Sequence, residues 1–393
     1  MQLSQRVQRI QPSPPLAIPA RAARLRAEGR DIIGFGAGEP DFDTPEHIKE
    51  AAIQAIRDGF TRYTAVAGTV ELRRAVCAKF RRDNGLEYDP EQVLVSVGGK
   101  QSFYNLAQSL LDPGDEVIIP APYWVSYPDM VLLADGVPVI VAAGIEQGFK
   151  ITPGQLEAAI TPRTRLVVIN SPSNPTGATY SREELAALGA VLARHPRIVV
   201  ASDDIYEHTR LTDAPFCNIL MACPELRERA VVLNGVSKAY AMTGWRIGYA
   251  AGPRPLIDAM KKIQSQSTSN PTSISQVAAQ AALEGDQSCI EVMNRAFQER
   301  HRFVVEALNA LPGVECLPSQ GAFYAFPRMA GAMERLGVED DVAFGERLIE
   351  EAGVALVPGS AFGAPGYMRL SFATSMENLR EGLARIGRLL GAG

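Results

Sequence analysis

The chain has 393 residues, of which 46% are hydrophobic and 21% charged, as expected of a soluble protein with two domains or one large domain with an appendage. Its 39 basic and 44 acidic residues are mixed along the sequence and leave a net charge of −5, which argues against nucleic-acid binding and against an anionic membrane surface. We therefore expect a small-molecule partner.

Cysteine and histidine usage narrows the class further. The five cysteines form no Cys-x-x-Cys pair, which argues against a disulfide framework and favours a reducing, cytoplasmic compartment. The four histidines are too dispersed for a recognisable zinc pattern, so we expect no metal site. No apolar run is long enough to span a bilayer, and the first residues lack the apolar centre of a secretory signal.

The N-terminal segment contains four prolines, at positions 12, 14, 15 and 19. They predict an extended arm, followed by a helix over Arg21 to Glu28 and a short strand at residues 31–33. The glycine-rich loop at residues 34–41 lacks the spacing of a dinucleotide fingerprint, so we expect its backbone to approach something small.

Two helices are predicted next. Thr44, Pro45 and Glu46 form a typical helix start, with a capping hydroxyl, a proline and an acid in the first turn. A second helix is expected over Glu71 to Asn84.

The strand at residues 93–97 runs into Gly98-Gly99-Lys100 and then a helix over Phe103 to Leu111. Backbone N–H groups at a helix start suit a phosphate. The Walker pattern is absent, because Gln101 stands where a hydroxyl residue is needed directly after the lysine. The junction favours a phosphate-bearing cofactor over nucleotide hydrolysis.

From here strands and helices alternate, which predicts an α/β class with a mainly parallel sheet covered on both faces. The expected strands are residues 116–119, 137–141, 165–169, 198–201 and 231–233. Polar clusters follow several strands, at residues 122–124, 170–177, 202–206 and 237–238. Ligands bind at the carboxyl ends of such strands, so these clusters should converge on one pocket.

Only seven lysines occur, which makes a search for a covalent lysine short. Four fall on expected helices, and Lys150 lies in a polar connection, so Lys100 and Lys238 remain. A Schiff-base lysine must reach a carbonyl carbon and lose its proton near neutral pH. Lys238, on a glycine-rich loop between two apolar strands, fits best, although the loop alone could also be an ordinary surface connection.

The C-terminal part departs from the regular alternation of strands and helices. A long helical region is expected over Ile290 to Leu311, with short strands at residues 322–326, 354–357 and 368–372. Ser375 is expected to cap the last helix. We predict a large domain over residues 45–284 and a small α+β domain from residues 1–44 and 285–393.

Several motifs together resemble class I aminotransferases of pyridoxal-phosphate fold type I, closest to the bacterial aspartate aminotransferase group. The motifs are residues 38–45, 122–127, 171–177, 202–206, 237–248 and 368–371. The resemblance covers nearly the whole chain. It implies a large domain with a mainly parallel, seven-stranded-type sheet sandwiched by helices, a smaller α+β domain, and pyridoxal 5'-phosphate as cofactor.

The resemblance also implies roles for the ring-binding residues. Lys238 is the residue that bonds covalently to the cofactor and shuttles the proton at the substrate Cα. Asp203 pairs with the pyridinium nitrogen, Tyr206 and Asn174 bond the 3′ oxygen, and Trp124 stacks on the ring.

The phosphate is expected to meet Gly99, Lys100, Ser237 and Arg246. By the same resemblance, Tyr63 reaches this phosphate from a second subunit of a homodimer with shared active sites.

Arg369 is expected to bind the substrate α-carboxylate, assisted by Gly38 and Asn174, with Trp124 also beside the substrate. The implied reaction is ping-pong transamination of an L-amino acid with a 2-oxo acid such as 2-oxoglutarate.

Substrate choice is less defined. The group is expected to bind a distal carboxylate with an N-terminal threonine and a lysine; Lys100 is present, but Pro15 replaces the threonine, and Ser13 is the nearby hydroxyl. Aspartate or another dicarboxylic or aromatic donor is the first expectation. Alternatives are an aromatic-amino-acid or prephenate aminotransferase, a lyase of the same fold, and a regulator without turnover.

Overall fold

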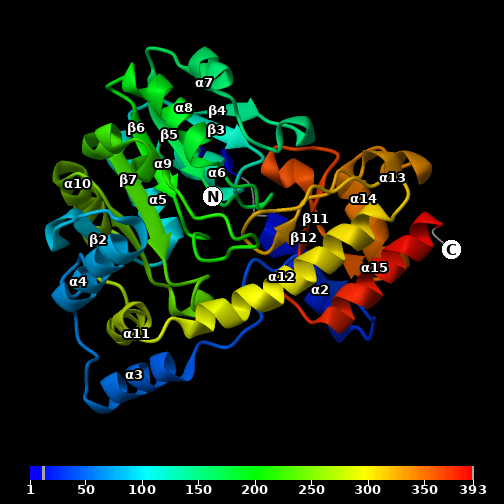
Figure 1. Cartoon of the computed structure of the whole chain (residues 1–393), viewed down its shortest axis with the longest axis horizontal. Coiled ribbons are helices and arrows are strands. Elements are labelled where there is room, and N and C mark those ends of the chain that lie inside the picture. Colours follow the sequence, from blue (N-terminus) through cyan, green and yellow to red (C-terminus); the bar gives the residue numbers. More distant parts are fainter. Residues whose placement is uncertain (11–13, 392–393) are drawn as a thin grey trace.

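Two groups of secondary-structure elements make up the chain, and a long helix runs between them (Figure 1). The computed structural model describes residues 1–10 and 14–391. The larger group surrounds a seven-stranded sheet, and the smaller group contains a two-stranded and a three-stranded sheet. The predicted α/β class with a mainly parallel sheet is confirmed. The proposed boundaries at residues 44/45 and 284/285 stay a prediction.

The central sheet has the strand order β2-β8-β7-β6-β5-β3-β4. Its strands are β2 (Val93–Ser96), β3 (Glu116–Ala121), β4 (Val137–Ala142), β5 (Thr164–Asn170), β6 (Val199–Asp203), β7 (Ala230–Gly235) and β8 (Gly248–Ala251). Strands β4, β3, β5, β6 and β7 run parallel, whereas β8 is antiparallel to both of its neighbours. The carboxyl ends of the parallel strands therefore meet at one edge.

Helices cover both faces of this sheet (Figure 1). They are α4 (Val70–Lys79), α5 (Gly99–Leu110), α6 (Ser126–Leu133), α7 (Pro153–Ala159), α8 (Arg182–Ala193), α9 (Ile219–Ala222), α10 (Arg254–Ser265) and α11 (Ser273–Glu284). Helix α3 (Glu46–Arg57) packs against α11, further from the sheet (Figure 1). Successive strand residues pack on opposite faces: Val167 joins the core under α4 and α8, whereas Val168 joins the core under α5 and α6. This alternation is the two-residue period of a strand buried on both faces.

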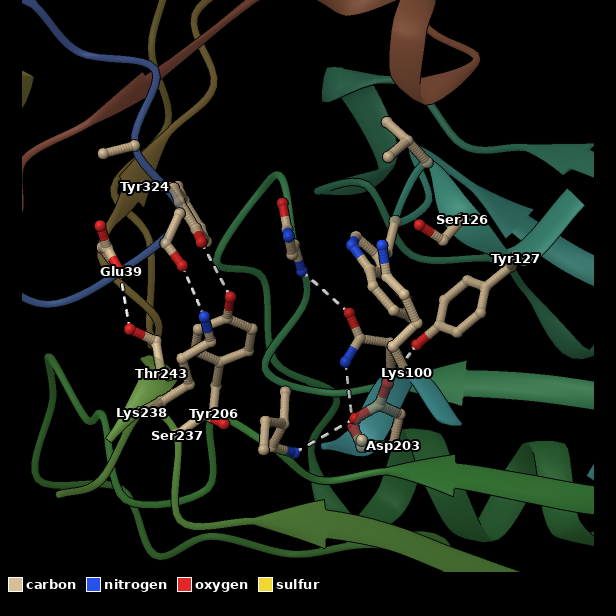
Figure 2. Close-up of a pocket in the computed structure, with 18 of the residues that line it drawn as sticks. Glu39, Lys100, Ser126, Tyr127, Asp203, Tyr206, Ser237, Lys238, Thr243 and Tyr324 are labelled. Carbon is tan, nitrogen blue, oxygen red and sulfur yellow. Dashed lines mark hydrogen bonds between the residues drawn. The ribbon is translucent and has the colours of Figure 1, made fainter. Parts of the chain in front are cut away.

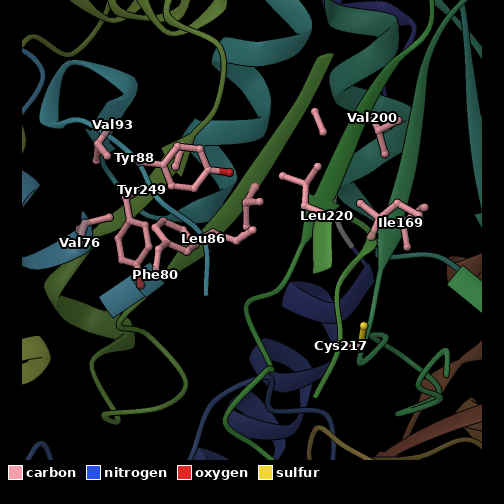
Figure 3. Packing of buried hydrophobic residues seen from close by; sticks show 14 of the residues in the cluster. Val76, Phe80, Leu86, Tyr88, Val93, Ile169, Val200, Cys217, Leu220 and Tyr249 are labelled. Atoms are coloured by element: carbon pink, nitrogen blue, oxygen red, sulfur yellow. The ribbon is translucent and has the colours of Figure 1, made fainter. Parts of the chain in front are cut away.

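Aromatic rings anchor one of these two cores (Figure 3). Phe80 packs edge-on against Tyr88 and Tyr249, with ring centroids 5.3 and 5.8 Å apart. Tyr249 lies on β8, and Phe80 follows α4 in a π-helical turn, Phe80–Asn84. The contact between Phe80 and Tyr249 holds the π-helical turn against β8 of the sheet.

The smaller group contains α12 (Ser288–Asn309), α13 (Ala330–Arg335), α14 (Asp341–Arg347), α15 (Met376–Leu390), β9 (Tyr324–Ala325), β10 (Val354–Ala355), β11 (Val357–Pro358) and β12 (Met368–Ser371). Two N-terminal elements join it, α2 (Pro14–Ala27) and β1 (Ile33–Gly34), which pairs with β10. A short helix, α1 (Gln5–Gln8), packs near α6 instead. The predicted cap of α15 is confirmed, since Ser375 accepts a hydrogen bond from the Asn378 N–H.

The expected extended arm is wrong from residue 14 onward, because α2 already begins at Pro14. Prolines in a first helical turn cost little, since those N–H groups have no helical partner. Pro19 lies further into the helix, where a proline removes one helical hydrogen bond. Pro12 lies outside the described residues.

Other local expectations also differ from the structure. Helix α5 begins at Gly99 instead of Phe103, and the expected strand at 354–357 is divided into β10 and β11. Thr44 does not cap α3, which begins at Glu46; its hydroxyl donates to the Ala241 carbonyl at 2.7 Å and accepts from Trp245 Nε1. A distant partner therefore competes with the local cap.

No helix within residues 1–10 and 14–391 combines the length and apolar character needed to cross a membrane.

Candidate active site

A cavity of about 420 Å³ lies at the carboxyl ends of the central strands and is closed by the loop around Gly38 and by β12 (Figure 2). The predicted residues that line it are Gly38, Gly99, Lys100, Trp124, Asn174, Asp203, Tyr206, Ser237, Lys238, Arg246 and Arg369. They come from segments more than 300 residues apart in the sequence. The expected convergence of the polar clusters on one pocket is therefore confirmed.

Lys238 lies three residues beyond β7, with its side chain half-buried in the cavity. Its ammonium donates to the Gly38 carbonyl and lies 5.8 Å from the centroid of the Tyr206 ring. Burial lowers the pKa of Lys238 to about 8; Arg369 and Arg246 lower it further, and Glu39 opposes them. A pKa near neutral makes the free amine accessible, as a nucleophile or a base requires.

Asp203, the last residue of β6, is buried in the cavity wall. Its carboxylate accepts hydrogen bonds from two neutral donors, the Tyr127 hydroxyl and the Ile205 N–H. Burial raises the pKa of Asp203, although the bond from Tyr127 opposes the rise. A cation placed in the cavity would stabilise this carboxylate.

Tyr127 and Tyr324 received no role from the sequence. Tyr127 lay within a quoted motif at the start of an expected helix, but its contact with Asp203 spans 76 residues. Tyr324 lies on β9, and its hydroxyl is 2.8 Å from that of Tyr206. Burial raises the pKa of Tyr206 well above its ordinary value, with Tyr324 adding to the rise, so Tyr206 stays a neutral phenol.

One wall of the cavity is suited to an anion. Gly99 and Lys100 form the first turn of α5, where backbone N–H groups point away from the helix. Arg246 lies beside them; a Cβ at Gly98 would be 2.2 Å from its guanidinium nitrogen. Arg246 holds a left-handed φ of 56°, a conformation that costs a non-glycine residue roughly 1–3 kcal/mol.

Gly248 allows β8 and the start of α5 to pack closely together in this wall. A Cβ at Gly248 would lie 2.2 Å from the Gly99 nitrogen, so only glycine lets β8 approach the start of α5. Ser237 follows β7 and lines the same wall. Burial lowers the pKa of Lys100, and the charge of Arg246 lowers it further.

Arg369 on β12 is 2% exposed and closes the opposite side. One terminal nitrogen donates to Asn174 Oδ1 and the other to the Gly36 carbonyl, each at 2.9 Å. Its Nε is buried and has no hydrogen-bond partner among the described residues. The guanidinium also lies 4.5 Å from the centroid of the Tyr324 ring. A buried cation with only neutral acceptors is suited to a carboxylate ligand.

Trp124 and Glu39 complete the lining. The Lys100 ammonium lies 5.2 Å from the centroid of the Trp124 ring, which itself meets Tyr127 edge-on. Glu39, which the sequence did not single out, accepts a hydrogen bond from the Thr243 hydroxyl at 2.6 Å. Tyr63, expected to act from a second subunit, lies outside the cavity of its own chain and is 92% exposed.

These residues fit pyridoxal phosphate. The cavity has an anion-binding wall at the start of α5, a buried carboxylate with only neutral donors, and a lysine with a lowered pKa between them. The glycines at 98 and 248 let Arg246 and β8 pack directly against the start of α5, where any side chain would clash. The Arg369 guanidinium, which has only neutral acceptors, marks a separate place for a carboxylate.

Comparisons with known proteins agree with this geometry. The family model for aminotransferase class I and II matches residues 30–386. An aspartate/prephenate aminotransferase of Nitrosomonas europaea is 63% identical over 396 residues, covering 99% of this chain and 100% of the relative. An aspartate aminotransferase of Geobacillus stearothermophilus is 52% identical over 393 residues, covering 100% of both.

Solved structures resemble the whole chain. The aspartate aminotransferase of Rhizobium meliloti superposes with a TM-score of 0.96 at 48% identity, covering 100% of this chain and 99% of that one. The aspartate aminotransferase of Thermus thermophilus with maleate gives 0.94 at 46% identity, covering 99% and 100%.

Proposed function

The chain belongs to the class I and II aminotransferase family, whose members use pyridoxal phosphate, and we propose from this premise that aspartate is its preferred amino donor. The reaction is transfer of an amino group from an L-amino acid to a 2-oxo acid. One observation carries the assignment of the site: Lys238, Asp203 and Arg369 line a single cavity.

When bound, pyridoxal phosphate supplies an aldehyde that bonds amines covalently and a ring that withdraws electrons from the substrate Cα. In our proposal Asp203 holds the proton on the ring nitrogen, with Tyr127 keeping the carboxylate ionised. Lys238 Nζ holds the cofactor covalently between turnovers and moves the proton at the substrate Cα. Its pKa of about 8 supports this role, because a useful fraction is neutral near pH 7.

The other polar residues orient the reactants. Gly99, Lys100, Ser237 and Arg246 are proposed to bind the phosphate, and the left-handed backbone of Arg246 supports a functional constraint there. Tyr206 and Asn174 are placed to bond the ring 3′ oxygen, with Trp124 over the ring face.

Arg369 is proposed to bind the substrate α-carboxylate through its guanidinium, with Asn174 and the Gly38 N–H beside it. Asn174 supports this role, since it already accepts a hydrogen bond from Arg369. Donor and acceptor share this site in turn, so the same residues serve both half-reactions.

A dicarboxylic donor is supported by the relatives named aspartate aminotransferase and by the Thermus thermophilus enzyme, which is described with maleate. Lys100 is a cation in the cavity that could meet a second carboxylate. Prephenate is the second candidate, as the acceptor, because a relative at 63% identity is named aspartate/prephenate aminotransferase. The side chains of Ser13 and Pro15 lie outside the part described.

A homodimer with shared active sites is also part of the proposal. Tyr63 is exposed in its own chain, and the same region exposes the apolar side chains of Ile53, Ile56 and Phe60. Apolar exposure of this kind is typical of an interface. A cytoplasmic location is supported by the five free cysteines.

The test is a donor and acceptor panel with enzyme reconstituted with pyridoxal phosphate. Aspartate, glutamate, phenylalanine and tyrosine are offered with 2-oxoglutarate, and aspartate is offered with prephenate. We expect the highest kcat/KM for aspartate. A clear preference for an aromatic donor would overturn the assignment of donor, and borohydride reduction with peptide mapping would overturn the site if the cofactor were found away from Lys238.

A further inference from the structure

A charged cluster is buried outside the lining of the cavity. Glu207 and Lys79 form an ion pair with side chains 2% and 1% exposed. Two amides complete it: Asn84 Nδ2 donates to one Glu207 oxygen at 2.8 Å and Asn234 Nδ2 to the other at 2.7 Å. Lys79 also donates to Asn84 Oδ1 at 2.7 Å. We call these four residues the rear cluster.

The rear cluster keeps its charges because it is fully paired. Burial alone would raise the pKa of Glu207, but the charge of Lys79 and the bond from Asn84 hold it below its ordinary value. Asp83 and His208 place a carboxylate oxygen and an imidazole nitrogen close to Glu207, which are atoms of the kind that bind metal ions. The Lys79 ammonium already supplies the positive charge at this place. A buried carboxylate with this many donors is held rigidly, since losing any one donor is costly.

The position of Glu207 in the chain gives the cluster a consequence for the site. Glu207 directly follows Tyr206 and lies four residues after Asp203. Its partner Asn234 lies on β7, four residues before Lys238. One carboxylate thus joins the segment that carries Asp203 and Tyr206 to the segment that carries Lys238.

Asn234 passes this constraint along the backbone. Its Oδ1 accepts a hydrogen bond from the Gly235 N–H at 2.7 Å. Gly235 is tightly enclosed, since a Cβ there would lie 3.0 Å from both Gly248 Cα and the Ile247 carbonyl. The chain between Asn234 and Lys238 therefore has little freedom to absorb a shift.

We propose that Glu207 is a positioning residue, whose hydrogen bond to Asn234 sets where Lys238 Nζ lies relative to Asp203 and Tyr206. The inference rests on the proposed role of Lys238. Glu207 does not line the cavity, so its effect on the reaction passes through Asn234.

The chain offers a matched pair of variants. Asn234→Ala and Asn84→Ala each remove one amide donor from Glu207, but only Asn234 lies on the Lys238 segment. We expect Asn234→Ala to lower kcat roughly 10- to 100-fold, as small displacements of reacting groups do, with a smaller change in KM. It should also shift the pH midpoint of Lys238 labelling by an amine reagent in the apoprotein. Asn84→Ala should lower the melting temperature and leave both readouts unchanged.

Two double variants keep the test decisive if Asn234→Ala folds poorly. Lys79→Met with Glu207→Gln removes both charges together and keeps an acceptor for Asn234, whereas Lys79→Met with Glu207→Ala removes the acceptor too. We expect the first double variant to keep the wild-type pH midpoint of Lys238 labelling and the second to shift it. Equal shifts in both, or equal effects of the two asparagine variants, would show general loosening and overturn the proposal.

Failure of the proposed function would look different. If the wild-type holoenzyme carried its cofactor on a residue other than Lys238, peptide mapping after borohydride reduction would show it without any variant. Correct attachment to Lys238 together with an unaffected Asn234→Ala variant would overturn the positioning role alone.

Discussion

The phenolic hydroxyl of Tyr127 donates a hydrogen bond to the carboxylate of Asp203, and both groups are buried. Tyr127 lies in the first turn of α6, and Asp203 is the last residue of β6. The bond opposes the rise in the pKa of Asp203 that burial causes. Tyr127 therefore helps to keep a carboxylate ionised where a cationic ring nitrogen is expected.

Removing this hydroxyl should weaken cofactor binding. A hydrogen bond to a charged group contributes about 1.5–3 kcal/mol, and 1.4 kcal/mol is a factor of ten, so we expect Tyr127→Phe to raise the cofactor Kd roughly tenfold. Titration of the apoprotein with pyridoxal phosphate measures it. Tyr88→Phe is the control, because its buried hydroxyl has no partner among the described residues. Equal Kd values for the two variants would contradict the role of Tyr127.

The amine of Lys238 should titrate early. With a pKa of about 8 instead of the usual ~10.4, roughly a tenth of it is neutral at pH 7. Only the neutral form reacts with an amine reagent, so labelling of Lys238 in the apoprotein should rise with a midpoint near pH 8. Mass spectrometry of the labelled peptide gives this midpoint.

The charge of Glu39 tests the electrostatic cause of the lowered pKa of Lys238. Its negative charge raises the pKa of Lys238, so Glu39→Gln should move the midpoint to lower pH and speed labelling at pH 7. Glu46→Gln is the matched control, since Glu46 raises the pKa of Lys49 instead. A midpoint that moves to higher pH in Glu39→Gln would refute the electrostatic account.

The sequence predicted those parts of the site that follow from local pattern. Lys238 stood out because few lysines occur and only two were expected outside helices and ordinary connections, and Asp203 comes just after the apolar strand expected at residues 198–201. Tyr127 and Tyr324 could not be found this way, because their partners lie 76 and 118 residues away. Thr44 was misassigned for the same reason: its local signal is that of a cap, and its partner is Ala241.

Arg369 should matter for substrate more than for cofactor. Lysine at this position keeps a charge but cannot form the two-pronged contact, and the buried Nε already lacks a partner. We expect Arg369→Lys to raise KM for aspartate roughly 100-fold, in line with the loss of a buried charged contact. The cofactor Kd should stay unchanged. Arg300→Lys, which alters a pair with Asp41 outside the cavity lining, should leave KM as it is.

The role of Lys100 can be assigned from whether its removal weakens binding of the substrate or of the cofactor. If it meets the distal carboxylate, Lys100→Met should lower kcat/KM for aspartate and glutamate roughly tenfold or more, while phenylalanine is nearly unaffected. If it serves the phosphate, the cofactor Kd should rise and all donors should suffer alike. The same donor panel and apoprotein titration separate the two outcomes.

Tyr63 tests whether two chains share each site. It is 92% exposed in its own chain, so its proposed contact with the phosphate requires a second copy. In a shared-site dimer, Lys238→Ala supplies an intact Tyr63 and Tyr63→Ala supplies an intact Lys238. Mixing these two variants after partial unfolding and refolding should therefore rebuild one complete site in each mixed dimer. We expect activity well above that of either variant alone, and about half that of wild type for each mixed dimer. Activity equal to the average of the two parents would show that Tyr63 acts in its own chain or not at all.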